Sequence, residues 1–550
     1  MALALSACTP QRVPTPPPAT PITTLTTPTP APTASPSLTA TPRTGDPARM
    51  PSAAPASWAD WTRFAQALRA STQADLMAAQ PPLHYQLEIR LDLEHRRITG
   101  QEWIHFTNNS PGPLAELPLR LYPNLGRSEI VLSIKRLLIA GAADVGEPAT
   151  SSVESLSRAV PPRLLAENSA VVATLAQPLA PGASLGLYVE FEARLPDEGG
   201  GNYSTFGYAA GVLALAQFYP TVPRIGSAGW DLETPPLFGD MTTADPALYD
   251  VWVTAPTGMT LVATGVTAAV TDNRDGTTTS YFVGGPQREF NLVASRDFEV
   301  KSRQVGDVTI NSYYAPGHEP GGQAVLDWAS EAFSIYQAAF GAYPYTELDI
   351  AATPTDAGGV EYPGLVVIAD RMYDQAGERG SFFEIAVVHE VAHQWWYNLV
   401  GDDQVREPWL DEAVTQYATV LYYDARYGAD GRAGIVKSFN DRWNRVKSTN
   451  DQPIGLPVAS YEGGAYGAIV YGKGPLFLLA LRERMGADLF ARFLKDYSAA
   501  YRWRTATTQD FWNAAETSCA CQLDDLFTQW VTARLSDSTE LVAGSPKSPP

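Results

Sequence analysis

The chain has 550 residues and a formal charge of −20, from 59 acidic and 39 basic side chains. This length leaves room for two or more domains with a large core, and the acidic balance argues against nucleic acid as a partner. Three cysteines are too few for a disulfide framework, and no apolar run in the sequence is long enough to span a bilayer. The sequence therefore indicates an acidic globular protein with more than one domain.

Residues 1–8 end in Leu5-Ser6-Ala7-Cys8, which resembles a bacterial lipobox, whose cysteine becomes lipid-modified. The stretch lacks a basic segment and its apolar part is short, so either the true start lies upstream or the match is accidental. Residues 9–57 are almost entirely Pro, Thr, Ala and Ser, which predicts a disordered tether. A tether favours an extracytoplasmic protein that is anchored through Cys8 on the outer face of a bacterial cell membrane, or secreted. The alternative is a disordered tail without an anchor.

Residues 58–303 are predicted to form an N-terminal β domain, with an amphipathic helix over residues 58–79 leading into it. From about Leu83 onward apolar and polar residues alternate, as in half-buried and mostly antiparallel strands. We interpret His84, His95 and His105, which are scattered among these strands, as structural or surface residues. The expected strands are Tyr85–Leu93, Ile98–Phe106, Leu117–Tyr122, Ala170–Leu175, Ser184–Phe191, Tyr249–Ala255, Thr278–Val283 and Phe290–Ala294.

Residues 304–537 have more helical patterns, which predicts a second, mainly helical domain before a disordered tail at residues 538–550. An amphipathic helix is expected at Ala324–Phe340. Two strands, Leu348–Thr353 and Leu365–Ala369, are expected on either side of a glycine-rich segment. Cys519 and Cys521 are separated by one residue, and two ordinary thiols are a simpler interpretation than a strained bridge.

The segment Val388-His389-Glu390-Val391-Ala392-His393 is the strongest functional pattern. Ser381 and Glu384 have capping-box spacing, which predicts a helix that begins here and stops by Gly401. His389 and His393 would then share one helix face and could bind one metal ion. Glu390 would project beside that metal, where a general base is needed.

A second helix is predicted from about Pro408 to a stop at Gly428. If it packs antiparallel to the first, Glu412 becomes a third ligand and the fourth position stays open for water, as in a catalytic zinc site. Other divalent ions can occupy such sites. Glu407 and Asp411 flank this ligand and either orient a histidine or are ordinary charges in a first helical turn. A chance motif on a buried helix is the alternative, but two of the six histidines fall here.

Four segments in this order and spacing resemble the zinc aminopeptidase (gluzincin) family of membrane alanyl aminopeptidase, also called aminopeptidase N, and leukotriene-A hydrolase. They are Gly358–Tyr362, His389–His393, Glu412 and Val470-Tyr471-Gly472-Lys473-Gly474, with eighteen residues between His393 and Glu412. The likeness covers about four fifths of the chain. The chain resembles a short form of the family, without the C-terminal helical domain that many members have. It implies an α+β fold, with an N-terminal antiparallel, saddle-like β domain followed by a thermolysin-like, mainly helical zinc peptidase domain.

The resemblance also implies site residues and one Zn²⁺ per chain. His389, His393 and Glu412 would hold the zinc, Glu390 would activate the zinc-bound water, and the Tyr471 hydroxyl would stabilise the tetrahedral intermediate. Without the motif, Tyr471 would be interpreted as a core aromatic residue. Ala413 stands where the family usually has glycine.

The segment Gly358-Gly359-Val360-Glu361-Tyr362 corresponds to the family's substrate-binding Gly-x-Met-Glu-Asn motif. By this resemblance Gly358 and Gly359 contact substrate and Glu361 binds its free α-amino group, which restricts cleavage to the first peptide bond. This chain has Val360 for Met and Tyr362 for Asn, which affects the expected S1 pocket. The Ala216-Gln217-Phe218 segment resembles a Thr-Gln-Phe segment whose glutamine lines that pocket, so Gln217 is a further substrate-binding candidate.

The resulting hypothesis is a zinc-dependent aminopeptidase that removes N-terminal residues from peptides. Its partners would be peptide substrates, with no nucleic acid, and membrane contact only through the anchor at Cys8; the sequence leaves the oligomeric state open. A thermolysin-like endopeptidase shares the metal ligands but gives no reason for Glu361. An epoxide hydrolase and a catalytically silent surface protein that binds peptides are two further candidate functions.

Overall fold

The computed structural model describes residues 58, 60–80, 82–140, 163–198, 205–226, 229–462 and 464–532. The lipobox at Cys8, the tether and the predicted tail at 538–550 lie outside these residues. Among the described residues no helix is both long enough and apolar enough to cross a bilayer. The predicted α+β organisation is confirmed, because a β-rich N-terminal part is followed by a mainly helical part, each with its own buried apolar cluster.

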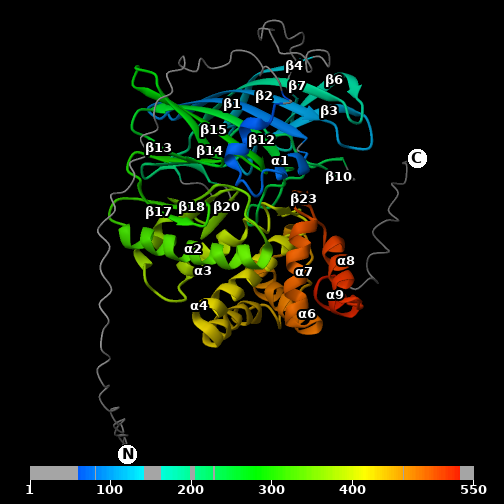
Figure 1. Ribbon diagram of the computed structural model, residues 1–550. Coiled ribbons are helices and arrows are strands. Elements are labelled where there is room, and N and C mark those ends of the chain that lie inside the picture. The colour runs from blue at the N-terminus through cyan, green and yellow to red at the C-terminus, as the bar shows by residue number, and fades with distance from the viewer. Residues whose placement is uncertain are drawn as a thin grey trace, which may run out of the picture. The chain divides into compact units, whose positions relative to one another are not determined.

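A seven-stranded sheet dominates the β-rich part (Figure 1). Leu87 and Ile89 alternate with polar neighbours, and they are buried in the apolar cluster on one face of this sheet. All neighbouring strands are antiparallel except β1 and β12, which run parallel. In spatial order the strands are β14 (Val266–Asp272), β15 (Thr277–Gln287), β12 (Ala247–Pro256), β1 (Leu83–Asp92), β2 (Arg97–Thr107), β7 (Ser184–Arg194) and β4 (Leu132–Ala140).

Three smaller antiparallel sheets complete the β-rich part, and the predicted mostly antiparallel pattern holds there as well. The first contains β13 (Thr260–Ala263), β16 (Leu292–Ser295), β9 (Val212–Leu215) and β8 (Phe206–Ala209). The second contains β3 (Leu114–Arg120), β6 (Ala170–Leu179) and β5 (Arg163–Leu165). The third pairs β10 (Ile225–Gly226) with β11 (Gly229–Trp230).

The prediction of an amphipathic helix over residues 58–79 is wrong. The chain instead forms a 3-10 helix, η1 (Thr62–Ala67), and one short turn, α1 (Asp75–Ala78). Polar side chains of this segment bind it to residues that are distant in the sequence. Arg63 Nε donates to Asp250 Oδ1 at 2.8 Å, and Thr72 Oγ1 donates to the Pro344 carbonyl at 2.7 Å. These long-range bonds override the helical periodicity of the segment.

The helical part begins with a mixed sheet in the order β17 (Glu299–Val305), β18 (Val308–Tyr314), β19 (Glu347–Thr353), β21 (Leu365–Ala369) and β20 (Gly359–Tyr362). Figure 1 shows α2 (Glu319–Phe340) across one face of this sheet, and α2 also packs against the helix that bears the histidines. The boundary predicted at residues 303/304 falls inside β17, which pairs with β18. By sheet membership, the helical part begins at about Glu299.

Two predicted helix stops are corrected by the structure. The first helix, α3 (Phe382–Ala392), ends at His393 rather than near Gly401. Gly401 instead lies in β22 (Val400–Gly401), which pairs with β23 (Arg504–Thr505); a Cβ at Gly401 would lie 2.2 Å from the Arg288 guanidinium carbon. The second helix, α4 (Trp409–Asn444), is kinked at Gly428 and continues beyond it.

The remaining helices follow α4 in the chain and lie within the predicted helical domain. Of these, α5, η7 and α6 pack directly against α4. They are α5 (Ala465–Ala468), the π-helical turn η7 (Ile469–Lys473), α6 (Gly474–Met485), α7 (Ala487–Ala500), α8 (Thr508–Cys519) and α9 (Asp524–Trp530). Cys519 and Cys521 form a disulfide, so the preferred interpretation of two free thiols is wrong. Short 3-10 turns occur at Tyr122–Asn124, Asp370–Gln375 and Val458–Ser460.

Candidate active site

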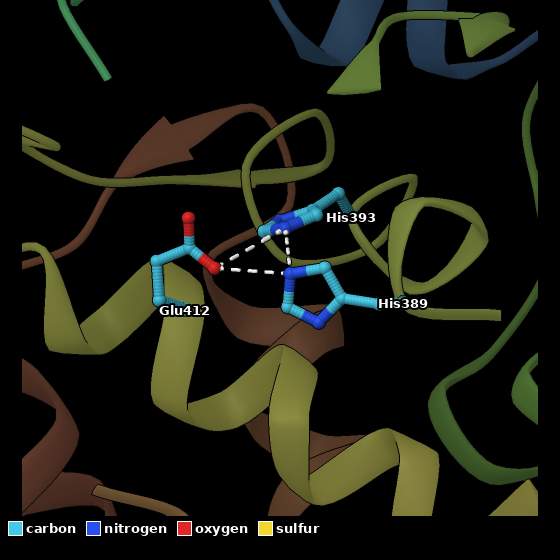
Figure 2. Close-up of side chains that lie close together, drawn as sticks. All are labelled: His389, His393 and Glu412. Carbon is cyan, nitrogen blue, oxygen red and sulfur yellow. Dashed lines mark hydrogen bonds and ion pairs between the residues drawn. The ribbon is translucent and has the colours of Figure 1, made fainter. Parts of the chain in front are cut away.

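Two packed helices bring the three predicted metal ligands together (Figure 2). At the start of α3 the Ser381 hydroxyl accepts the Glu384 N–H at 3.2 Å, so one of the two bonds of the predicted capping box forms. The Glu384 carboxylate accepts the Gly380 N–H at 2.7 Å and not that of Ser381. His389 lies in the last turn of α3 and His393 is its C-cap. Glu412 lies in the first turn of α4. All three side chains are buried.

The spacing of the donor atoms fits one metal ion. Nε2 of His389 lies 3.1 Å from Nε2 of His393 and 3.1 Å from Oε2 of Glu412, and Nε2 of His393 lies 3.6 Å from the same oxygen. A zinc ion with ligand bonds of about 2.0–2.1 Å holds tetrahedral ligands about 3.3 Å apart. Two imidazoles and one carboxylate are also a ligand set that zinc accepts. The residues present therefore fit a zinc ion.

The histidine that ends α3 is oriented by its second ring nitrogen. Nδ1 of His393 lies 2.9 Å from the Trp396 carbonyl oxygen and 2.5 Å from Asp411 Oδ1. These acceptors keep the ring proton on Nδ1 and leave the Nε2 lone pair for the metal. Asp411 thus orients a histidine, which is one of the two roles expected for it. Glu407 does not, because its Oε1 accepts the Thr508 N–H at 2.9 Å.

Burial and neighbouring charged groups shift the pKa values of several side chains in the site. Burial lowers the pKa of His389 to about 4. Burial opposes ionisation of Glu412, but its contacts with His389 and His393 outweigh this effect and hold its pKa well below the usual range. Burial, with Asp411 and Glu412 nearby, raises the pKa of Glu361 to about 8. The site is thus strongly acidic and favours a bound cation.

The proposed base, Glu390, is buried on α3 directly beside β20. A Cβ on Gly359 would lie 2.5 Å from Glu390 Cγ and 2.8 Å from its carboxyl carbon. Only a glycine leaves this carboxylate in its observed place. Burial and the nearby Glu361 raise the pKa of Glu390 well above its ordinary value.

Tyr471 lies in the π-helical turn η7, which packs against α4. Its hydroxyl donates to Glu412 Oε1, and its ring centroid lies 5.9 Å from that of His389. π-turns often occur at functional sites because the extra residue redirects a side chain. The predicted intermediate-stabilising residue thus reaches the metal ligands.

A cavity of about 240 Å³ unites nearly all predicted site residues. Its lining includes the three ligands, Glu390, Tyr471, Glu361, Gly358 and Gly359. β20 supplies Glu361, and this strand is absent from the sequence prediction because glycines dominate its start. The amine-binding candidate therefore faces the same space as the metal ligands.

Gln217 does not line this catalytic cavity. Its Nε2 donates to Glu289 Oε2 at 2.6 Å, in a small adjoining cavity whose lining also includes Glu361 and Asp240. The prediction that Gln217 contacts substrate directly is thus not supported by its position. It belongs to the wall next to the amine-binding candidate.

Sequence reasoning missed several polar residues of the site. Asp240 and Arg442 line the catalytic cavity, and Gln404 lies behind Glu361 with its side chain buried. Asp240 and Gln404 come from irregular segments, which carry no periodic signal. Arg442 lies near the end of α4, beyond the stop that was predicted at Gly428.

Comparison with known proteins agrees with this geometry. Residues 324–530 match the peptidase family M1 domain. Aminopeptidase M1-C of rice (Oryza sativa subsp. japonica) is 28% identical over 234 residues, which are 40% of this chain and 26% of that protein. Endoplasmic reticulum aminopeptidase 1 of Rattus norvegicus is 25% identical over 469 residues, 80% of this chain and 46% of that protein. The chain spans about a quarter to a half of the length of these relatives.

A solved structure shows the same fold. The M1 zinc metallopeptidase of Deinococcus radiodurans superposes with a TM-score of 0.61 at 21% identity, over 83% of this chain and 95% of that one. A mutant of the Deinococcus protein has also been solved with a Tyr-Ser-Ala substrate, at a TM-score of 0.60 over the same shares of the two chains. The two-part α+β architecture is therefore that of a known M1 zinc metallopeptidase.

Proposed function

We propose that this protein is a zinc-dependent aminopeptidase that hydrolyses N-terminal residues from peptides. The observation that carries the proposal is the placement of Glu361 in the cavity that also holds the three metal ligands and Glu390. A buried carboxylate at this place can pair with an ammonium group, and only the first peptide bond has a free amine beside it. The names of the relatives, aminopeptidases and a zinc metallopeptidase, support the same activity.

The proposed mechanism assigns one task to each side chain. When bound, zinc supplies Lewis-acid polarisation of the scissile carbonyl and lowers the pKa of the attacking water. Glu390 accepts the proton of that water and passes it to the leaving nitrogen. Its raised pKa makes it a stronger proton acceptor.

Two further groups complete the proposed mechanism. Tyr471 turns its hydroxyl from Glu412 to the carbonyl oxygen as negative charge develops there, and donates a hydrogen bond to it. Glu361 holds the substrate ammonium and so fixes which bond lies beside Glu390. The deeply buried and acidic surroundings exclude competing anions from the site.

The test compares aminoacyl p-nitroanilides with their N-acetylated forms, for zinc-loaded wild type, Glu361→Ala and Glu390→Gln. We expect wild type to cleave only the free-amine substrates, Glu361→Ala to lower kcat/KM by about 10²-fold, and Glu390→Gln to lower kcat by about 10²–10⁴-fold. Zinc content of each variant is measured alongside. Equal cleavage of acetylated substrates would favour the endopeptidase, and no cleavage by zinc-loaded wild type would favour the silent peptide-binding protein.

A further inference from the structure

One buried amide joins the amine-binding side of the cavity to the metal side. Gln404 lies in the segment between β22 and α4, with a side chain 2% exposed. Its Nε2 donates to Glu361 Oε1 at 3.0 Å and to Asp411 Oδ2 at 2.6 Å. A side-chain amide carries two protons, so one amide group satisfies both carboxylates.

The two carboxylates belong to different tasks. The other oxygen of Asp411 contacts Nδ1 of His393, whose Nε2 faces the metal site. Glu361 lines the cavity, where the proposed function gives it the substrate ammonium. A single continuous path of contacts therefore runs from Glu361 through Gln404 and Asp411 to a metal ligand.

The surroundings fix which way the amide points. In the ionised form that pairs with an ammonium group, Glu361 can only accept hydrogen bonds, and the same holds for ionised Asp411. The NH₂ end of Gln404 therefore faces both side chains. The oxygen end lies 3.4 Å from the Thr242 hydroxyl, which belongs to the β-rich part and also donates to Glu289 at 2.9 Å. The β-rich part thus closes the far side of the amide. Without this donor, two buried carboxylates would be left side by side with no proton between them.

We propose that Gln404 is a positioning residue that couples recognition of the substrate amine to the orientation of the metal ligand His393. It holds Glu361 by one oxygen and leaves the rest of that carboxylate to the ammonium, and it holds Asp411 against the imidazole. The inference rests on the proposed function in one respect, because it takes the ligand of Glu361 to be an α-ammonium.

Recognition of the amine is tested by equilibrium binding to zinc-loaded protein with two probes, leucinol and 4-methylpentan-1-ol. They differ only in the amino group, and neither contains a bond that the proposed enzyme cleaves. Wild type should prefer leucinol. Gln404→Met, which keeps the shape and removes both donors, should reduce that preference by about tenfold or more. Gln404→Glu serves as a second variant of the same shape, and we expect the same loss from it.

The metal half is tested by titrating bound zinc against a chelator. We expect Gln404→Met to weaken zinc binding by about tenfold, as for other partners that hold a ligating histidine. Gln86→Met is the matched control, because Gln86 is also buried but lies in β1, away from the cavity. Gln86→Met should leave the amine preference and the zinc affinity unchanged. Any decrease in its thermal stability gives the cost of removing a buried amide that lies away from the cavity.

Double variants separate positioning from general damage. In the Glu361→Ala background Gln404→Met should no longer change the amine preference, and in the Asp411→Ala background it should no longer change zinc affinity. Full effects in both backgrounds, or an unchanged preference in both Gln404 variants, would overturn the proposal. Because neither probe can be hydrolysed, a wild type that binds leucinol and zinc but cleaves no aminoacyl substrate would contradict only the proposed function.

Discussion

At the scale of single residues, the position of Glu390, the proposed general base, depends on the absence of a side chain at Gly359. Replacing Gly359 with alanine places a Cβ 2.5 Å from Glu390 Cγ, so that the carboxylate must move. The three metal ligands are not touched. We expect Gly359→Ala to lower kcat by about 10²-fold, because small misplacements of reacting groups have effects of that size, while zinc content stays at one per chain. Steady-state kinetics with metal analysis measures both.

The neighbouring glycine is the control for that variant. A Cβ on Gly358 would lie 3.1 Å from the ring of Phe382, an exposed side chain that can move aside. Gly358→Ala should therefore leave Glu390 in place and keep kcat within about threefold of wild type. Because Gly358 lines the catalytic cavity, any effect of this variant should fall on KM. An equal loss of kcat in both variants would contradict the steric role of Gly359.

The residues of the proposed active site differ in how well the sequence predicts them. His389, Glu390 and His393 could be predicted because their spacing is local to one helix. Glu412 needed only one assumption about how two neighbouring helices pack. Gln404 and Asp240 could not be predicted, because irregular segments bring them to the site and nothing in their spacing marks them. The resemblance alone placed Gln217 in the pocket, and the structure places it one layer behind.

At the scale of elements, α4 depends on a glycine that breaks it. Gly428 has φ 64° and ψ −154°, a conformation that is open essentially to glycine alone, and no atom of the described residues crowds its Cβ position. Gly428→Ala should therefore lower the free energy of unfolding by about 1–3 kcal/mol through backbone strain. Denaturant unfolding of the zinc-loaded protein measures this change.

A second glycine in the same helix gives the opposite expectation. Gly434 is also exposed and uncrowded but has no positive φ, so Gly434→Ala should stabilise the protein by about 1 kcal/mol. If both alanines destabilise α4 equally, strain at the kink is not the cause.

The elements that were wrong or missed in prediction share one physical reason, which is long-range contact. The periodicity of residues 58–79 favours a helix, but hydrogen bonds to distant residues fix a different path. Gly428 was interpreted as a helix stop, but α4 is only kinked there and continues to Asn444. The whole helix is held by its packing against α6 and η7, which are distant in the sequence. Strands with clean alternation, such as β1 and β2, were predicted to within a few residues.

At the scale of the whole molecule, the order of strand-like and helix-like segments in the sequence predicted the fold class. It did not predict which strands pair with one another. Strand-like residues precede helix-like residues, and that alone gives an α+β protein. The parallel pairing of β1 with β12 joins segments far apart in the chain, since Leu83 lies opposite Ala247, and its direction leaves no mark on either sequence. The same holds for the contacts between the β-rich and helical parts, which combine apolar side chains from both parts with a few buried polar side chains.

Arg288 makes several of the polar contacts between the two parts. Its guanidinium is buried and donates to the carbonyls of Tyr397 at 2.6 Å, Ala244 at 2.7 Å and Arg504 at 2.9 Å, among others. Three of its four acceptor carbonyls belong to the helical part, namely those of Tyr397 and Asn398, just after α3, and that of Arg504 in β23. Arg288→Met leaves several buried acceptors without a donor, so we expect the free energy of unfolding to fall by about 3 kcal/mol or more.

The loss should also reach the active site, because Tyr397 follows His393 closely in the chain. Zinc affinity should therefore fall in Arg288→Met, as measured by chelator titration. Arg296→Met is the control, since Arg296 is exposed and donates to the Thr257 carbonyl within the β-rich part. It should change stability by no more than about 0.5 kcal/mol, the usual range for surface substitutions. Equal stability of the two variants would show that the Arg288 contacts do not hold the two parts together.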